Sequence, residues 1–320
     1  MCYNTVMGNE LTLPKTLVEA IRYFSDPDKC LTTAMAFVWP DGVVCPHCKA
    51  KDAHFIATRR IWRCISCKKQ FSIKVGTIFA DSPLGLDKWL TAIWLIANAK
   101  NGVSSYELSR SIGVTQKTAW FMLHRIRLAM KTGTFRKLSG AVEADETFIG
   151  GLEKNKHEDK KLHAGRGSVG KAVIMGLKER GGELRAFVID NTKRETLHGE
   201  IKKQVNPGTL LVTDAFPAYR GLTPDYYHLF VDHAVKYVEG GVHTNGLENF
   251  WCLLKRTLKG TYTYCSPQHL ERYLDEQVCR YNACKDTDLQ RFTAALGRIA
   301  GRSLTYEQLT HGHLTLYGKA

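Results

Sequence analysis

The sequence lacks an apolar run long enough to cross a lipid bilayer. A membrane-spanning helix needs about 20 predominantly apolar residues, and the most apolar stretch of this chain, residues 89–99, is far shorter. We interpret that stretch as a buried helix of a globular core, and we expect no membrane partner.

The chain also opens without the basic and apolar segments of a secretory signal. We therefore expect a cytoplasmic protein whose thiols are reduced. Six of the ten cysteines follow no regular spacing. One of them, Cys252, has no histidine paired with it, so we interpret it as a small packing residue rather than a nucleophile.

Acidic residues are scarce relative to basic ones. The 320 residues include 45 Lys and Arg against 31 Asp and Glu, which gives a net charge of +14. The imbalance lies mainly in residues 1–137, with 20 basic and 9 acidic residues, whereas residues 138–320 carry 25 and 22. Nucleic acid is the expected partner, with most of the affinity in the front part. A merely solvated surface is the alternative, because net charge alone does not identify a ligand.

Two cysteine pairs have the spacing of a structural zinc site. They are Cys45-Pro-His-Cys48 and Cys64-Ile-Ser-Cys67, separated by 15 residues. Each pair predicts a tight knuckle that directs two thiolates at one tetrahedral Zn2+. His47 would give a Cys3His site, but the four cysteines already complete the ligand set. The surrounding basic and aromatic side chains would contact phosphates or keep a small ribbon soluble: Arg59, Arg60, Trp62, Arg63, Lys68, Lys69 and Phe71.

Residues 104–130 have the pattern of a helix-turn-helix. One helical segment ends at Gly113, and a second begins after Thr115, a residue type that caps helices. The first residues of the second helix would face base edges, and basic residues farther along would contact phosphates. An ordinary helical hairpin is the alternative, because this succession is common. The candidate DNA-binding residues are Thr115, Gln116, Lys117, Arg125 and Arg127, with Thr118 beside them.

Beyond Ser139 the sequence alternates between strand-like and helix-like segments. Apolar runs at 142–149, 172–177, 184–189 and 209–213 predict the strands of an α/β domain. The polar residues 153–171, rich in Lys, His and Gly, predict a loop that contacts DNA or a solvated hairpin.

Three acidic residues occupy positions suited to metal binding. Asp145 lies in the first predicted strand, Asp214 directly follows the fourth, and Glu248 lies in a predicted helix at 245–259. Ligands bind where the strands of α/β sheets end, and hard cations such as Mg2+ prefer carboxylate oxygens. The open alternatives are Glu143 or Glu146 in place of Asp145, a helix-capping turn at Asp214, and a plain surface position for Glu248.

The predicted helix at 245–259 separates apolar from polar side chains. Its apolar face at helical period consists of Leu247, Phe250, Leu254 and Leu258. Its polar stripe places cations and an amide beside an acid, which suits a phosphate next to a metal ion: Asn245, Glu248, Lys255 and Lys259.

Five motifs together resemble those of bacterial insertion-sequence transposases of the ISXO2-like group. The likeness covers nearly the whole chain, and the order of the motifs is more specific than any one of them. They are Trp39-Pro-Asp-Gly-Val-Val-Cys-Pro-His-Cys48; Gln70-Phe-Ser followed by Gly76-Thr-Ile-Phe79; Lys117-Thr-Ala-Trp120 with Arg125-Ile-Arg127; Val142-Glu-Ala-Asp-Glu-Thr147; and His243-Thr-Asn-Gly-Leu-Glu-Asn-Phe-Trp251.

The resemblance implies an RNase-H-like catalytic domain with an Asp-Asp-Glu triad. Asp145, Asp214 and Glu248 match its three acids, and Asn245 and Lys255 match the accompanying polar positions. The implied cofactors are Mg2+ or Mn2+ at the triad and a structural Zn2+ at the cysteines. We expect the three acids to converge within a few ångströms.

The activity that the resemblance implies is DNA transposition. Such an enzyme recognises double-stranded terminal inverted repeats, cleaves there, and joins the 3′-hydroxyl ends to target DNA by two-metal phosphoryl transfer. Joining two ends in concert implies a homodimer or larger assembly on DNA, in the bacterial cytoplasm and associated with the nucleoid through DNA.

Two other functions compete with transposition. One is a zinc-ribbon and helix-turn-helix DNA-binding regulator with a non-catalytic RNase-H-like scaffold, and the presence of all three acids argues against it. The other is a stand-alone RNase-H-like nuclease without strand transfer. The separate DNA-reading front part argues against that second alternative.

We therefore predict a multidomain α/β protein. Its segments are an N-terminal helical lead at 1–42, a zinc ribbon at 43–80, a helix-turn-helix region at 81–137, an RNase-H-like catalytic domain with a mixed sheet and flanking helices at 138–300, and a C-terminal tail at 301–320.

Overall fold

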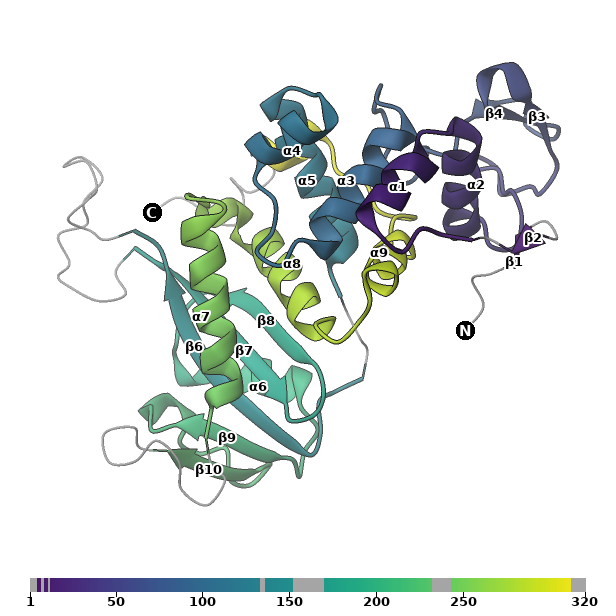
Figure 1. Ribbon diagram of the computed structural model, residues 1–320. Coiled ribbons are helices and arrows are strands. Elements are labelled where there is room, and N and C mark those ends of the chain that lie inside the picture. The colour runs from purple at the N-terminus through teal and green to yellow at the C-terminus, as the bar shows by residue number, and fades with distance from the viewer. Residues whose placement is uncertain are drawn as a thin grey trace. The chain divides into compact units, whose positions relative to one another are not determined.

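The computed structural model describes residues 5–6, 9–10, 12–132, 136–151, 170–231 and 243–311 (Figure 1). The chain forms two compact units. We call residues 1–131 with 285–320 the terminal unit, and residues 132–284 the central unit. Most of the predicted polar loop at 153–171 lies outside the described residues.

The terminal unit begins with a short antiparallel pair and two capped helices. Strands β1 (Thr5–Val6) and β2 (Asn9–Glu10) pair with each other. Helix α1 (Leu17–Phe24) starts at a capping box formed by Thr16 and Glu19, and α2 (Pro27–Val38) starts at Asp26, whose carboxylate accepts two backbone N–H groups. These caps satisfy donors that a helix N-terminus leaves unpaired, so the sequence fixes where each helix begins.

A three-stranded antiparallel sheet follows and packs against α2. Its strands are β3 (Ala53–Ile56), β4 (Ile61–Cys64) and β5 (Gln70–Phe71). The core of this sheet includes apolar side chains as well as the cysteines. Its buried residues join those of α2 in one cluster: Leu31, Ala34, Cys45, Trp62, Cys64, Phe71 and Ile73.

The remaining helices of the terminal unit surround α3 (Leu86–Asn98). Trp89, Leu90, Ile93 and Trp94 of this helix are at most 1% exposed, which confirms the predicted buried helix. None of the described helices is both long and apolar enough to cross a membrane. The other helices are α4 (Ser105–Ile112), α5 (Gln116–Met130), α9 (Asp288–Leu296) and α10 (Tyr306–His311).

The boundary between the units differs from the prediction. The catalytic domain was predicted to extend to residue 300, but the central unit ends at Cys284 and the chain then returns to the terminal unit. The reason is packing: Phe292 of α9 is fully buried, with its ring 4.9 Å from that of Trp94 and 5.6 Å from that of Phe24.

The central unit contains a five-stranded mixed sheet in the order β10-β9-β6-β7-β8. Strands β6, β7 and β8 are antiparallel neighbours, β9 runs parallel to β6, and β10 runs parallel to β9. This arrangement is the RNase-H-like sheet that the resemblance implied. The strands are β6 (Ala141–Ile149), β7 (Ala172–Glu179), β8 (Leu184–Ile189), β9 (Leu210–Asp214) and β10 (Tyr227–Val231).

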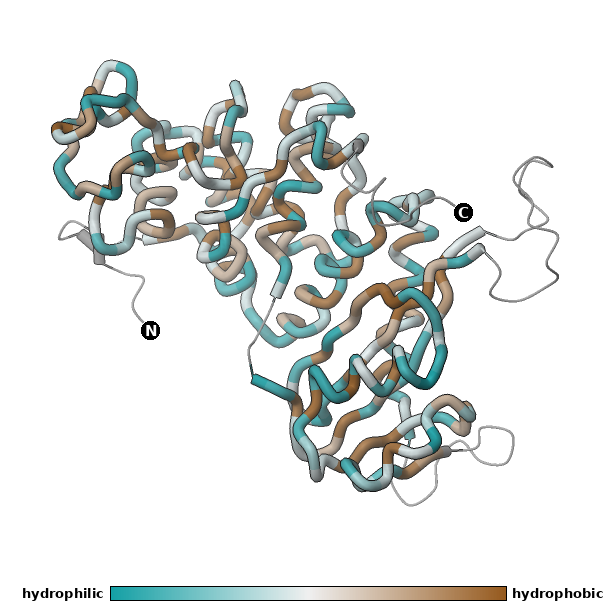
Figure 2. Tube along the Cα trace, turned by 180° about the vertical axis from the view of Figure 1, so that it is seen from behind, coloured by the Kyte–Doolittle hydropathy of each residue, from teal (hydrophilic) through white to brown (hydrophobic). Residues whose placement is uncertain are grey.

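Helices cover both faces of this sheet. On one face α6 (Arg194–Gln204) packs through Leu197 and Ile201 against apolar side chains of β6 and β7. On the other face lie α7 (Asn245–Gly260) and α8 (Leu270–Asn282), and α7 crosses β6 and β7 (Figure 1). Viewed from behind, apolar and hydrophilic stretches alternate along the chain of the central unit (Figure 2). Successive residues of β6 therefore face different helices, which decides the roles of its acids.

Candidate functional site

The four predicted cysteine ligands form a compact cluster. The sulfur atoms of Cys45, Cys48, Cys64 and Cys67 all lie within 4.8 Å of one another. The Cys45–Cys67 and Cys48–Cys64 sulfur distances are 3.7 and 3.5 Å. Four thiolates about 2.3 Å from a tetrahedral Zn2+ would be about 3.8 Å apart. The donor set and its spacing fit a structural Zn2+, and exposed His47 is not part of the cluster.

Both knuckles have the same backbone geometry. Lys49 and Lys68 follow the second cysteine of each pair with φ angles of 63° and 62°, and each donates its N–H to the carbonyl of the first cysteine. The amide of Cys67 donates to the sulfur of Cys64 and lowers the pKa of that thiol to about 6. This favours the thiolate, the form that binds metal.

Asp145 and Asp214 lie on neighbouring parallel strands. Glu143 of β6 pairs with Val212 of β9. Two residues farther along each strand are Asp145 and Asp214, at the same level and on the same face of the sheet. Asp214 also accepts the N–H of Phe216 at 3.1 Å. Asp214 therefore caps the following turn, as the alternative interpretation expected, and this contact is compatible with a place in the acidic site.

Glu248 lies in the first turn of α7, on the same face of the sheet, and its side chain is exposed. Burial, together with the negative charges of Asp214 and Glu248, raises the pKa of Asp145 to about 6. The three carboxylates therefore share one electrostatic environment. Among the described residues, the cysteine cluster is the group of three or more possible metal ligands that lie together, and the three acids do not form a second such group.

The other two acids of β6 have separate partners. Glu143 is 2% exposed and accepts Arg180 Nε at 3.1 Å and the N–H of Leu247 at 3.2 Å. Glu146 points to the opposite face, where the hydroxyl of Tyr219 donates to it at 2.5 Å. Burial raises the pKa of Glu146 to about 7. These contacts favour Asp145 as the member of the triad, because Glu143 is occupied by Arg180 and Leu247 and Glu146 faces the other side of the sheet.

Known protein families match both parts of the chain. Residues 137–282 match the ISXO2-like transposase domain, and residues 25–70 match the transposase zinc-ribbon domain. The chain belongs to the ISXO2-like transposase family. Its central unit is a transposase domain with an RNase-H-like sheet. Its four-cysteine cluster lies in the segment that matches the family's zinc ribbon.

Two relatives of this transposase-family chain carry related names. An uncharacterized protein in transposable element ISH50 of Halobacterium salinarum is 26% identical over 235 residues, covering 69% of this chain and 79% of the relative. An uncharacterized transposase-like protein of Haemophilus influenzae is 31% identical over 96 residues, covering 30% of this chain and 77% of the relative. Because 235 residues exceed the length of the transposase-domain match, the first relative shares more than that domain.

The two helices predicted for the helix-turn-helix, and the glycine turn between them, are present in the terminal unit. Helix α4 ends at Gly113, whose φ of 62° suits glycine, and α5 begins after Thr115, whose side chain accepts the N–H of Thr118. Thr115 and Lys117 are exposed, as a base-reading role requires. Gln116 instead donates to the hydroxyl of Ser105 at 2.8 Å.

Arg125 and Arg127 are buried, and their predicted phosphate contacts were wrong. They are 4% and 1% exposed. Arg125 donates to the carbonyls of Leu304 and Ala80 at 3.0 and 2.5 Å. The helical period contained the signal, because Arg127 lies four residues after buried Leu123 and therefore on the inward face of α5.

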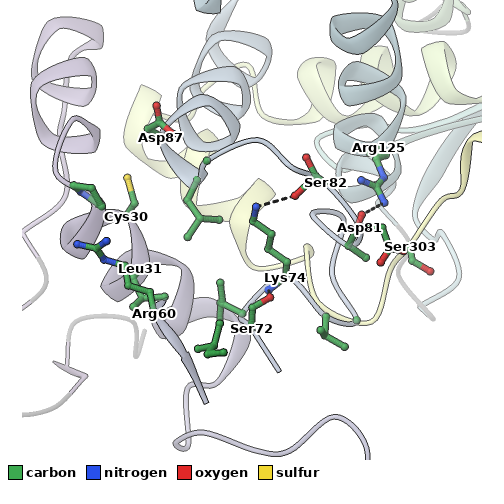
Figure 3. A pocket seen from close by; sticks show the side chains of 18 of the residues that line it. Cys30, Leu31, Arg60, Ser72, Lys74, Asp81, Ser82, Asp87, Arg125 and Ser303 are labelled. Atoms are coloured by element: carbon green, nitrogen blue, oxygen red, sulfur yellow. Dashed lines mark hydrogen bonds between the residues drawn. The ribbon is translucent and has the colours of Figure 1, made fainter. Parts of the chain in front are cut away.

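A cavity of about 940 Å3 opens in the terminal unit and is lined in part by basic residues (Figure 3). Lys74 donates to the carbonyls of Ser82 and Leu84 at 2.9 and 2.5 Å. Arg60 pairs with Asp28 at 2.7 Å. These cations hold the segments around the cavity together, and the acidic triad is not among its lining residues.

The polar stripe of α7 is confirmed. Its predicted apolar residues are buried, while Asn245, Glu248, Lys255 and Lys259 are exposed. Lys255 lies two turns beyond Glu248, which places it about 10 Å along the helix. A cation there would meet a phosphate near the acids rather than the metal ions themselves.

Proposed function

We propose that this chain is a DNA transposase that cleaves the ends of an insertion sequence and joins their 3′-hydroxyls to target DNA. One observation carries the proposal. Asp145 and Asp214 occupy the same level of two adjacent parallel strands, and their charges act together with that of Glu248 on α7. Carboxylates so placed repel one another, and divalent cations relieve the repulsion.

The triad would hold two Mg2+ or Mn2+ ions, because hard cations prefer carboxylate oxygens. When bound, these ions would activate a water for cleavage and then the freed 3′-hydroxyl for strand transfer. Asn245, three residues before Glu248 on the same helix stripe, would orient that carboxylate or the substrate. Lys255 would hold a phosphate beside the cut.

Recognition of the terminal inverted repeats is assigned to the terminal unit. Thr115 and Lys117 lie exposed at the start of α5, where a recognition helix reads base edges. The basic residues of the ribbon, among them exposed Arg63 and Lys69, would add contacts to phosphates that do not depend on sequence. Concerted joining of two ends would require a homodimer or larger assembly on DNA.

Strand transfer with linear duplexes that carry the element's own termini tests the proposal. The wild-type protein should join labelled 3′ ends to a target plasmid in Mg2+ or Mn2+. The variants Asp145→Asn, Asp214→Asn and Glu248→Gln should bind the termini but neither cut nor join them. Asp190→Asn is a matched control, because Asp190 is an exposed acid of the same unit just after β8.

The same assay separates the competing functions. Binding of the termini without cleavage by the wild-type protein in either metal would support the regulator with a non-catalytic scaffold. Cleavage without joining would support a stand-alone nuclease.

A further inference from the structure

Helix α7 contacts strand β6 at two polar points that have matching spacing. Glu143 accepts the backbone N–H of Leu247 at 3.2 Å, and Asp145 accepts the indole N–H of Trp251 at 2.8 Å. The two acids are two residues apart on a strand, or about 6.7 Å. The two donors are four residues apart on a helix, or about 6 Å. The two contacts therefore fix both the position and the rotation of α7 along β6.

Two glycines allow this close approach. Gly176 of β7 pairs with Asp145, and a Cβ at Gly176 would lie 2.6 Å from Trp251 Cζ2 and 2.7 Å from Leu247 Cδ2. A Cβ at Gly246 would lie 2.7 Å from Glu143 Oε2. The indole occupies the space that a side chain at position 176 would fill, directly beside Asp145.

Asp145 is held by a separate donor at each oxygen. Oδ1 accepts the N–H of Glu146 at 2.8 Å, and Oδ2 accepts that of Trp251 at the same distance. A carboxylate oxygen has two lone pairs, so each oxygen keeps one for another ligand. Indole donates and does not accept, so it orients the carboxylate without competing for a cation.

We propose that Trp251 is a positioning residue of the acidic site, an inference that rests on the proposed transposase function. Trp251 lies one turn after Glu248 on α7 and is 5% exposed. Its hydrogen bond orients the Asp145 carboxylate and sets the height of Glu248 above it. One side chain thus links the first and third acids of the triad, whose residues lie more than 100 positions apart.

The test separates this role from plain packing. Trp251→Phe keeps an aromatic ring over Gly176 and removes the N–H donor. Leu254→Ala is the matched control, because Leu254 is fully buried on the same helix and its side chain has no polar group. Asp145→Asn reports loss of the metal site itself. All variants are studied as zinc-loaded full-length protein.

The primary measurement is the rise in melting temperature of the DNA-free protein as Mn2+ is added. Loss of a partner that orients a metal ligand typically lowers metal affinity about 10–100-fold. Trp251→Phe should raise the half-saturating Mn2+ concentration by a factor in this range, and the Mn2+ requirement for strand transfer should rise in parallel. Leu254→Ala should lower the melting temperature without Mn2+ but leave the half-saturating concentration unchanged.

Two results would overturn the inference in distinguishable ways. If the wild-type protein responds to Mn2+ through Asp145 but Trp251→Phe has the same half-saturating concentration, the positioning role fails and the proposed function stands. If the wild-type response does not depend on Asp145, the metal site of the proposed function fails, and the inference fails with it.

Discussion

Single residues of the same type have different roles because the backbone directs them to different faces. On β6, Glu143 and Asp145 face α7, whereas Glu146 faces Tyr219 on the other side of the sheet. On α5, Lys117 is exposed and Arg125 is buried. The sequence therefore identifies which residues are ionisable. The face of the strand or helix on which each one lies decides whether its side chain is available to a ligand or packs inside the protein.

Arg125 and Lys117 should respond differently to replacement by alanine. Arg125→Ala leaves the buried carbonyls of Leu304 and Ala80 without their donors, so the free energy of unfolding should fall by about 3 kcal/mol. Lys117→Ala should change stability by less than about 0.5 kcal/mol and weaken binding to terminal DNA by about 1–3 kcal/mol. Urea unfolding and competition binding at fixed salt measure the two effects. Equal losses of Lys117→Ala on terminal and random DNA would contradict a base-reading role.

At the scale of elements, the strands that could be predicted from the sequence are those that helices cover on both faces of the sheet. β6, β7, β8 and β9 coincide with the predicted runs to within about two residues, because helices cover the sheet on both sides. β10 was not predicted. It is an edge strand whose Tyr227 and Phe230 are 74% and 65% exposed, so its sequence shows no buried pattern.

Gly176, at the contact between β7 and α7, and Gly199, inside α6, should respond in opposite directions to replacement by alanine. Gly176→Ala places a Cβ against Trp251 and Leu247, and overpacking of this kind should lower the free energy of unfolding by about 1–3 kcal/mol. Gly199 lies inside α6 with no atom within 4 Å of a built Cβ. Gly199→Ala should therefore stabilise by up to about 1 kcal/mol, since alanine favours helices. Urea unfolding measures both changes, and stabilisation by Gly176→Ala would contradict the close packing of α7 against β7.

Zinc removal should unfold the ribbon and leave the sheet of the central unit folded. Metal analysis should find about one Zn2+ per chain, and Cys45→Ser should lose it. Hydrogen exchange should then show loss of amide protection in β3, β4 and β5, while β6 and β7 stay protected. Because Trp62 and Phe71 also pack against α2, the apolar cluster should keep some contacts in a collapsed form. Cys252→Ser is the control, and unchanged protection in Cys45→Ser would contradict a metal-dependent ribbon.

At the scale of the whole molecule, the terminal unit is built from both ends of the described chain. Residues 285–320 group with residues 1–131, and α9 supplies Phe292 to the core between Phe24 and Trp94. Arg302 also donates to the carbonyl of Leu128 at the end of α5. The C-terminal segment is therefore part of the terminal unit rather than an extension of the central unit.

A chain that stops after Cys284 should have a destabilised terminal unit, whereas its central unit should stay folded. It loses α9, so Trp94 and Phe24 become exposed, and loss of one large buried ring typically costs about 3–5 kcal/mol. Amide protection in α1 and α3 should fall, while β6 and β7 of the central unit stay protected. Phe292→Ala in the full-length chain should show the same pattern more weakly. Loss of protection first in β6 would contradict the division into these two units.

The sequence alone determined the features that depend on local spacing. Cysteine pairs with two residues between them form knuckles, Gly113 and Thr115 end one helix and begin the next, and alternation at helical period separates the two faces of α7. Each of these follows from interactions within a few residues of chain, so composition and period suffice to predict them.

Only the tertiary structure decided which side chains meet across long separations. The register of β6 and β9 brings Asp145 level with Asp214, Trp251 reaches Asp145 across 106 positions, and Phe292 returns to the core of the terminal unit. Arg125 finds its hydrogen-bond acceptor, the carbonyl of Leu304, 179 positions away. These contacts arise from packing between elements that are distant in sequence, and no local pattern encodes such a partner.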